Sequence, residues 1–243
     1  MTKTFISSLI LTNAGAVNAI SLRVEGKPDY FSMRHNGDGT GENDRARNRR
    51  EFLLLLGFDE SSVVRGEQIH GDNIRFVEAP GNYPDTDSLV TKTKNLVLAI
   101  SVADCVPILI ADKKSQTIAA IHAGWRGTAK RIAVKAIDFM VNELRCDPKN
   151  IFAFIGPSAG VCCYEVGEVV AKRFRDGEVM KSSNPEKFLL DLKAANFSQL
   201  VGHGVPKGNI EVSKYCTIHD TKFHSYRRDG TASGRMLAVI GMK

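Results

Sequence analysis

The 243-residue sequence lacks the features that mark membrane and nucleic-acid-binding proteins. No apolar run approaches the length of about 18 residues that a membrane-spanning helix needs. Aromatic residues make up only 7% of the chain, the basic residues are scattered, and no nucleic-acid-recognition motif accompanies them. The formal net charge of +6 therefore indicates a small anionic partner, such as phosphate or a nucleotide-like substrate, and no protein partner can be inferred.

Disulfide and signal-peptide patterns are also missing. Five cysteines are an odd number in a chain of this length, which excludes a disulfide framework and indicates a reducing compartment, here the cytoplasm. The opening "MTKTFISSLILTNAGAVNA" places one lysine before an apolar stretch, as a signal peptide does. Two serines interrupt that stretch, so we expect a first strand there instead.

The remaining composition is that of one globular domain. Hydrophobic residues make up 43% of the chain and charged residues 25%, enough for one sizeable core without a disorder signature. Strand-like and helix-like segments alternate without a repeat or a linker, which predicts a mixed α/β fold as a single domain over residues 1–243. We expect helices over 42–57 and 128–144 and in "GEVVAKRF" and "DLKAANFSQLVGHG", and strands in "IRFVE", "DSLVT", "LVLAISVADC", "PILIAD", "TIAAIH", "NIFAFIG" and "RMLAVIG".

Coordinating side chains interrupt this pattern at three places, each at the end of a strand-like run. They are His70 in "EQIHGDN", Cys105 in "SVADCVP" and His122 in "IHAGWRGT". Imidazole and thiolate suit zinc, and three protein ligands leave a fourth position open, as in catalytic zinc sites. The spacings of 35 and 17 residues match no compact zinc motif. The structural alternative is that His70 caps a turn, Cys105 packs in the core and His122 hydrogen-bonds to a backbone carbonyl.

The stretch "HAGWRGTAKR" adds a candidate anion site. A glycine-containing turn leads into the helix expected from Thr128, beside Arg126, Lys130 and Arg131. Backbone N–H groups at a helix N-terminus bind phosphate or carboxylate, whereas cations there oppose the helix dipole. A capped helix with a solvated basic first turn is the structural alternative.

The ordered segments "QIHGDNI", "DSLVT", "ADCVPILIAD", "AAIHAGWRGTAKRI", "IGPSAGVCCYEVG", "DLKAANFSQL" and "FHSYRRDGTASGRMLAVI" resemble the YfiH-like proteins. These proteins were once labelled multicopper polyphenol oxidases with a laccase domain. The resemblance covers most of the chain and is strongest from Gln68 onward. It implies an α/β domain, similar also to the catalytic domain of cytotoxic necrotizing factors, with zinc held by His70, Cys105 and His122.

The resemblance also implies enzymatic activities. Family members are described as enzymes that phosphorolyse adenosine, inosine, guanosine and methylthioadenosine and that deaminate adenosine. Some bacterial members are assigned peptidoglycan editing, the removal of a wrongly incorporated serine. The chain departs from the family after "FSMRHNGDG", where a longer segment with a Ser-Leu-Asn stretch is absent, so substrate contacts from that part are in doubt.

The copper label disagrees with the histidine count. A trinuclear copper cluster with a blue-copper centre needs about ten histidines, and the chain has six. A lone blue-copper site needs two His, one Cys and an axial Met, and would make the protein an electron carrier. No methionine lies near the three residues in sequence.

Several polar residues are assigned provisional roles. Asp87 and Asp104 are candidates for the carboxylate that carries a proton in deamination, and Asp104 is also a candidate for orienting a histidine. Arg126 is expected to hold phosphate during phosphorolysis. In "SYRRDG", Arg227 and Arg228 either pair with carboxylates in a turn or clamp an anion. The vicinal cysteines of "VCCYEVG" are expected to be core and turn residues.

Three hypotheses follow. The first is a zinc-dependent purine nucleoside phosphorylase with adenosine deaminase activity. The second is an amidase that edits cell-wall precursors, with Cys105 as nucleophile and His122 as base. The third is a metal-binding or electron-carrier protein.

Overall fold

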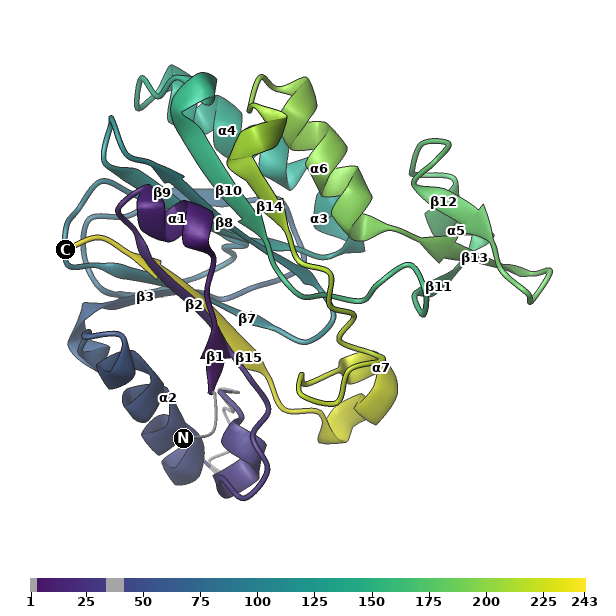
Figure 1. The fold of residues 1–243 in the computed structure, drawn as a ribbon, viewed down its shortest axis with the longest axis horizontal. Helices are drawn as coiled ribbons and strands as arrows, with labels where there is room; N and C mark the ends of the chain where they lie inside the picture. Colours follow the sequence, from purple (N-terminus) through teal and green to yellow (C-terminus); the bar gives the residue numbers. More distant parts are fainter. Residues whose placement is uncertain (1–3, 34–41) are drawn as a thin grey trace.

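The computed structural model describes residues 4–33 and 42–243, and within them the fold is built around two six-stranded sheets (Figure 1). The first sheet has the order β1 (Phe5–Ile6), β2 (Val17–Ser21), β15 (Met236–Gly241), β7 (Val97–Val102), β3 (Val63–Gly66), β5 (Gly81–Tyr83). The second has the order β14 (Ile210–Val212), β10 (Ile151–Ile155), β8 (Val106–Asp112), β9 (Thr117–Ala123), β6 (Ser88–Thr91), β4 (Ile74–Phe76). A small third sheet, β11 (Glu165–Gly167), β13 (Lys187–Leu190), β12 (Val179–Lys181), projects from one side.

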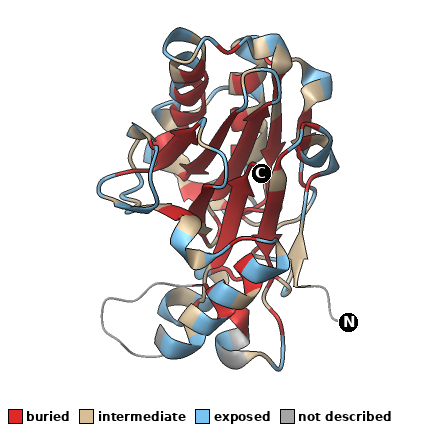
Figure 2. Cartoon of the chain, turned by 90° about the vertical axis from the view of Figure 1, so that its left-hand side faces the viewer, coloured by how far each residue is buried: buried red, intermediate tan, exposed pale blue. Residues whose placement is uncertain are grey.

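Both faces of the second sheet are covered. Strand side chains point alternately to opposite faces, so Leu109 and Ala111 of β8 join the core that also contains β7 and β15, while Ile108 and Ile110 join a second core under the helices. This double burial explains why β8 and β9 are buried along their whole length. Figure 2 shows the central strands of the molecule in the red of buried residues. It also explains why their sequences are continuously apolar and do not alternate.

Helices flank the two sheets. The helices α3 (Trp125–Ala129), α4 (Ile132–Asn142) and α6 (Leu192–Gly202) lie over the second sheet, and α2 (Glu42–Leu55) lies beside the first (Figure 1). The remaining helices are α1 (Leu9–Asn13), α5 (Glu168–Ala171) and α7 (Tyr226–Asp229), with short 3₁₀ turns at Pro28–Phe31, Glu60–Ser62, Pro148–Asn150, Lys207–Asn209 and Gly230–Ala232. The layers confirm the predicted mixed α/β fold class.

Two expectations about the elements were wrong. The first nineteen residues do not form one strand, because the buried Ser8 caps α1 by accepting a hydrogen bond from the Leu11 N–H, and the chain turns at Gly15 before β2. The helix expected over 128–144 is divided. Arg131 adopts a left-handed conformation (φ 63°), which ends α3 and starts α4.

The segment after Gly39, where the sequence departs from the family pattern, lies in residues 34–41 and thus outside the described residues. Within 4–33 and 42–243, none of the helices combines the length and apolarity needed to span a bilayer.

Candidate metal centre and active-site cavity

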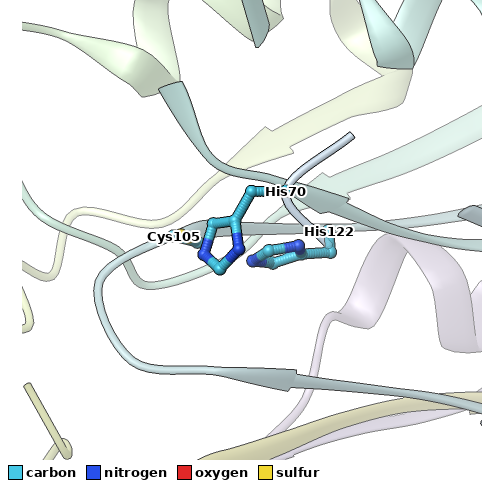
Figure 3. Close-up of side chains that lie close together, drawn as sticks. All are labelled: His70, Cys105 and His122. Atoms are coloured by element: carbon cyan, nitrogen blue, oxygen red, sulfur yellow. The ribbon is translucent and has the colours of Figure 1, made fainter. Parts of the chain in front are cut away.

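His70, Cys105 and His122 meet at one end of the second sheet (Figure 3). The pairing of β8 with β9 is antiparallel and places Val106 opposite Ala123, so the residue before β8 lies beside the end of β9. His70 comes from the loop between β3 and β4. One ligand atom from each of the three side chains lies within 4.8 Å of the other two, and the two imidazole rings are nearly perpendicular. His122 is buried, Cys105 is half-buried and His70 is exposed.

Asp87 organises two of these side chains. Its Oδ1 lies 2.7 Å from Nδ1 of the buried His122, and its two oxygens accept hydrogen bonds from the backbone N–H groups of Ile69, His70 and Gly71. His70 itself has a positive φ of 58°, a conformation that these hydrogen bonds stabilise. Because Nδ1 of His122 faces Asp87, its Nε2 is the nitrogen available to the centre.

Asp104 has a different role from the expected orientation of a histidine. Its oxygens accept hydrogen bonds from the Thr217 hydroxyl (2.6 Å) and the Arg227 N–H (2.6 Å), two segments far away in sequence. Asp104 also has a positive φ of 80°, so the chain bends directly before Cys105. The histidine is oriented by Asp87, and Asp104 joins the wall of the site to the C-terminal part of the chain.

Cys105 and His122 shift each other's pKa. Burial alone raises the pKa of the Cys105 thiol, but the charge of His122 and hydrogen bonds from His122 and His70 lower it to about 6. Burial alone lowers the pKa of His122, but the Cys105 thiolate and Asp87 raise it to about 9. The pair therefore favours a thiolate, which is the form that binds metals and attacks electrophiles.

The donor set fits a metal ion of the zinc type. One thiolate and two imidazoles are borderline-to-soft ligands, and a carboxylate that fixes the tautomer of a ligating histidine is the usual outer-shell partner. Gly124 permits the close packing, since a Cβ at this position would lie 3.1 Å from Sγ of Cys105 and 3.3 Å from Cδ2 of His70. The absence of a side chain at Gly124 thus leaves room for the three donor atoms to converge.

The centre opens onto a cavity of about 700 Å³. Three of the side chains that line it are aromatic, Trp125, Tyr164 and Tyr226, although sequence reasoning had named none of them. Burial, together with the charge of Cys105, raises the pKa of Tyr164 to about 12, so its phenol stays protonated. A second cavity of about 350 Å³ shares Gly66, Gln68 and Ser101 with the first.

An arginine guanidinium lies over each of these aromatic rings. The guanidinium of Arg126 lies 4.4 Å from the Trp125 ring centroid, that of Arg227 lies 4.9 Å from Tyr164, and that of Arg235 lies 5.5 Å from Tyr226. All three arginines line the cavity. Positive charge is therefore concentrated at the cavity wall.

Other predicted anion-binding residues lie elsewhere. Arg228 donates to the carbonyls of Thr217 and Phe223 and pairs with Asp229, so it braces the C-terminal loops and is not among the cavity-lining residues. Lys130 pairs with Asp72 (3.0 Å). The expected helix N-terminus at Thr128 does not exist, because Thr128 lies within the five-residue α3. Of the sites proposed in this region, the structure brings Arg126 to the cavity.

A second group of thiols lies outside this centre. Cys162, Cys163 and Cys216 also have their sulfur atoms within 4.8 Å of one another, and all three are free thiols. Cys162 is exposed, Cys163 is half-buried and both lie on a turn, so the expected turn is present but neither residue is in the core. Burial alone raises the pKa of Cys216, but backbone N–H groups of His219 and Gly160 lower it below its ordinary value.

Comparison with known proteins tests the resemblance. The family model described as multi-copper polyphenol oxidoreductase laccase matches residues 34–243. The chain belongs to this YfiH-like family. Its fold agrees, since the crystal structure of YlmD from Geobacillus stearothermophilus superposes with a TM-score of 0.91 at 31% identity, covering 100% of this chain and 97% of that one.

Two relatives named as purine nucleoside phosphorylases and one further solved structure are also similar to this chain. A protein of Deinococcus radiodurans named purine nucleoside phosphorylase is 43% identical over 202 residues, covering 81% of this chain and 77% of the relative. Purine nucleoside phosphorylase YlmD of Geobacillus stearothermophilus is 35% identical over 252 residues, covering 95% of this chain and 91% of the relative. A hypothetical protein YfiH of Bacillus licheniformis superposes with a TM-score of 0.87 at 30% identity, covering 94% and 93% of the two chains.

Proposed function

We propose that this chain is a zinc-dependent purine nucleoside phosphorylase that acts on adenosine, inosine, guanosine and methylthioadenosine and also deaminates adenosine. The observation that carries the proposal is the arrangement of one thiolate and two imidazoles at the edge of a cavity. Three aromatic rings line this cavity, and an arginine guanidinium lies over each of them. The names of the relatives support the same reaction class.

His70, Cys105 and His122 are the residues that hold zinc in this proposal. When bound, zinc supplies a Lewis acid and lowers the pKa of a water molecule. The part of the protein is to present one thiolate and two neutral imidazoles, with the proton of His122 kept on Nδ1 by Asp87.

The aromatic side chains bind the base. A purine offers a flat π-face and a polar edge, which match the rings of Trp125 and Tyr226 and the protonated phenol of Tyr164. Stacking does not discriminate among purines. This agrees with a substrate range that includes several purine nucleosides.

The arginines hold phosphate. In phosphorolysis the bond between the ribose C1′ and the purine nitrogen breaks, a phosphate oxygen bonds to C1′, and the purine leaves with a proton on its nitrogen. Arg126 and Arg227 have guanidinium groups at the cavity wall that can bind phosphate and position it for attack. The bound anion also stabilises the positive charge that develops on the ribose.

In this proposal, Asp104 is the carboxylate that moves a proton in deamination. A water oxygen replaces the amino group on the purine carbon, and ammonia leaves after taking up a proton. Asp104 lines the cavity and keeps a lone pair on each oxygen beyond those that Thr217 and Arg227 occupy. Asp87 is fully buried against His122, so it acts through that histidine and does not contact the substrate.

The amidase is the second candidate, and one observation favours it. Cys105, His122 and Asp87 follow one another as a thiolate, an imidazole and a carboxylate, which is the order of a nucleophile, its base and the group that orients the base. A blue-copper electron carrier has less support. No methionine is found among the residues that line the cavity in the described structure.

One incubation separates these functions. The purified protein is given adenosine with and without phosphate, before and after chelation, and adenine, inosine and hypoxanthine are resolved by chromatography. The phosphorylase proposal expects phosphate-dependent adenine, and the deaminase activity expects phosphate-independent inosine, both lost after chelation and restored by Zn²⁺. Absence of all three products from the zinc-loaded protein refutes the nucleoside activity and leaves the amidase.

A further inference from the structure

Cys162, Cys163 and Cys216 form a compact group of three sulfur atoms. The Sγ atoms of the vicinal pair are 3.4 Å apart, and all three lie within 4.8 Å of one another. Three thiolates on a tetrahedral zinc ion lie about 3.8 Å apart, given Zn–S bonds of about 2.3 Å. Small side-chain rotations are thus enough to bring the three sulfurs to the separation that a zinc ion requires.

The backbone around these thiols is closely joined. Cys216 forms an isolated bridge with Ser158, and the Thr217 N–H donates to the Ser158 carbonyl (2.9 Å). The Gly160 N–H donates to Sγ of Cys216 (3.2 Å). A Cβ at Gly160 would lie 2.9 Å from Cβ of Cys216 and 3.4 Å from Sγ of Cys162, so a glycine is needed for this approach. The two loops therefore hold the cysteines in place from both sides.

A cationic side chain, Lys193, lies close to the three thiols. Three thiolates with one divalent cation carry a net charge of −1. The ammonium of Lys193 donates to the carbonyls of Ser213 and Tyr215, just before Cys216 in the chain, and the charge of Asp191, followed by those of Cys216 and Cys162, opposes the lowering of its pKa by burial. One cationic side chain therefore lies beside the thiols, where it offsets part of that residual charge and part of the charge of Asp191.

We propose that Cys162, Cys163 and Cys216 form a second metal site that binds one Zn²⁺ through three thiolates, with solvent as the fourth ligand. Soft thiolate ligands select zinc over magnesium or calcium, and the exposure of Cys162 gives solvent access to the open position. The site is distinct from the His70–Cys105–His122 centre, with which it shares none of its ligands.

The second site is connected to the wall of the cavity. Tyr164 directly follows Cys163 and lines the cavity, and Thr217 directly follows Cys216 and donates to Asp104. Asp104 in turn accepts from the backbone of Arg227. A metal ion that joins the two cysteine loops therefore restrains the segments that carry Tyr164 and Arg227 at the cavity.

Cobalt provides a direct test in the full-length chain. Cys105→Ser removes the single thiolate of the first centre, so any sulfur-to-cobalt charge-transfer absorption then comes from another site. We expect the reduced, metal-free Cys105→Ser protein to take up one Co²⁺ with this absorption and to release it to Zn²⁺, which binds more tightly. Adding Cys162→Ser lowers the absorption by about one third, because the Co–S bonds fall from three to two.

Two further variants complete the test. Cys216→Ser is expected to lower the thiolate absorption by about one third, as Cys162→Ser does, whereas Cys146→Ser, at a buried cysteine beside Ser115, leaves the absorption unchanged. Since Cys162 is exposed, its variant remains informative even if Cys216→Ser fails to fold. The proposal is overturned if Cys105→Ser shows no thiolate absorption with Co²⁺, or if Cys162→Ser leaves that absorption intact. A disulfide between Cys216 and Cys162 or Cys163, in a protein that takes up no cobalt after reduction, replaces it with a redox pair.

Discussion

Asp87 lies 2.7 Å from Nδ1 of His122 and accepts hydrogen bonds from three successive N–H groups of the loop that carries His70. This one buried carboxylate therefore orients the imidazole of His122 and also stabilises the backbone conformation of the loop that carries His70. In the proposed zinc centre, this makes Asp87 a positioning residue for two ligands at once.

Replacing Asp87 should weaken metal binding without removing a ligand. Asp87→Asn keeps the shape but loses the charge, so we expect zinc affinity to fall by about 10- to 100-fold, measured by competition with a chromogenic chelator. Asp72→Asn is the matched control, because that carboxylate pairs with Lys130 and Lys135 outside the cavity. Equal affinities in the wild type and Asp87→Asn would falsify the positioning role.

The two histidines should each be required for zinc at the first centre. We expect His70→Ala and His122→Ala each to lose the zinc bound there, because two protein ligands hold the ion far less tightly than three. Zinc is counted by elemental analysis in a Cys162→Ser/Cys163→Ser background, which leaves only one thiolate at the second proposed site. His203→Ala, at the C-cap of α6, serves as the control. Retention of stoichiometric zinc by both variants removes this centre from consideration.

Arg126 should act on phosphate and not on zinc. Arg126→Ala removes a guanidinium from the cavity, so we expect the KM for phosphate in nucleoside cleavage to rise by about 10- to 100-fold, with zinc content unchanged. Lys130→Ala removes an equal charge one helical turn away, where it pairs with Asp72. An unaltered phosphate dependence in Arg126→Ala would return this residue to a structural role.

Alkylation of Cys105 should distinguish a ligand from a nucleophile. A zinc-bound thiolate has its electron pair engaged, so we expect iodoacetamide to label Cys105 slowly until a chelator removes the metal. In the chelated protein the labelling rate should rise with pH through about 6, as the lowered pKa of the thiol requires. Mass spectrometry follows the labelled peptide while adenosine turnover is measured.

The opposite result supports the amidase. If chelated protein keeps full activity and labelling of Cys105 alone then stops turnover, the zinc mechanism is wrong. Loss of activity in Cys105→Ala decides nothing, because ligand and nucleophile are both essential.

His224 should make the fold sensitive to acid. It is buried, its Nε2 has no hydrogen-bond partner among the described residues, and burial together with the Arg23 charge lowers its pKa to about 4. His224 takes up a proton near pH 6.5 in the unfolded chain and near pH 4 in the folded chain. Its contribution to the free energy of unfolding is therefore complete above pH 6.5 and is lost as the pH falls from 6.5 to 4.

The expected loss from His224 is roughly 3 kcal/mol in the free energy of unfolding between pH 6.5 and 4. Urea titrations at several pH values measure it, and His224→Asn should flatten this part of the profile. The same slope in the variant would assign the acid sensitivity to other groups.

Local sequence patterns were sufficient for many elements and for the composition of the site. The apolar runs of β7, β8, β9 and β10 and the glycine after α2 predict those elements because strand and helix formation depends on nearby residues. His70, Cys105 and His122 stood out because each is a coordinating side chain at the end of an apolar run. The structure brings these three together, but spacings of 35 and 17 residues carry no geometry by themselves.

Only the tertiary structure decided which side chains share a space. The antiparallel pairing of β8 with β9 brings Cys105 and His122 together, and the loop contacts of Asp87 add His70. The same folding brings Cys216 to the vicinal pair 53 residues before it and Arg227 to the cavity, while it turns Arg228 onto backbone carbonyls. The physical reason is that nearby residues determine local conformation, and a continuous apolar run even indicates burial on both faces, whereas no local pattern specifies which distant strands and loops become neighbours when the layers pack.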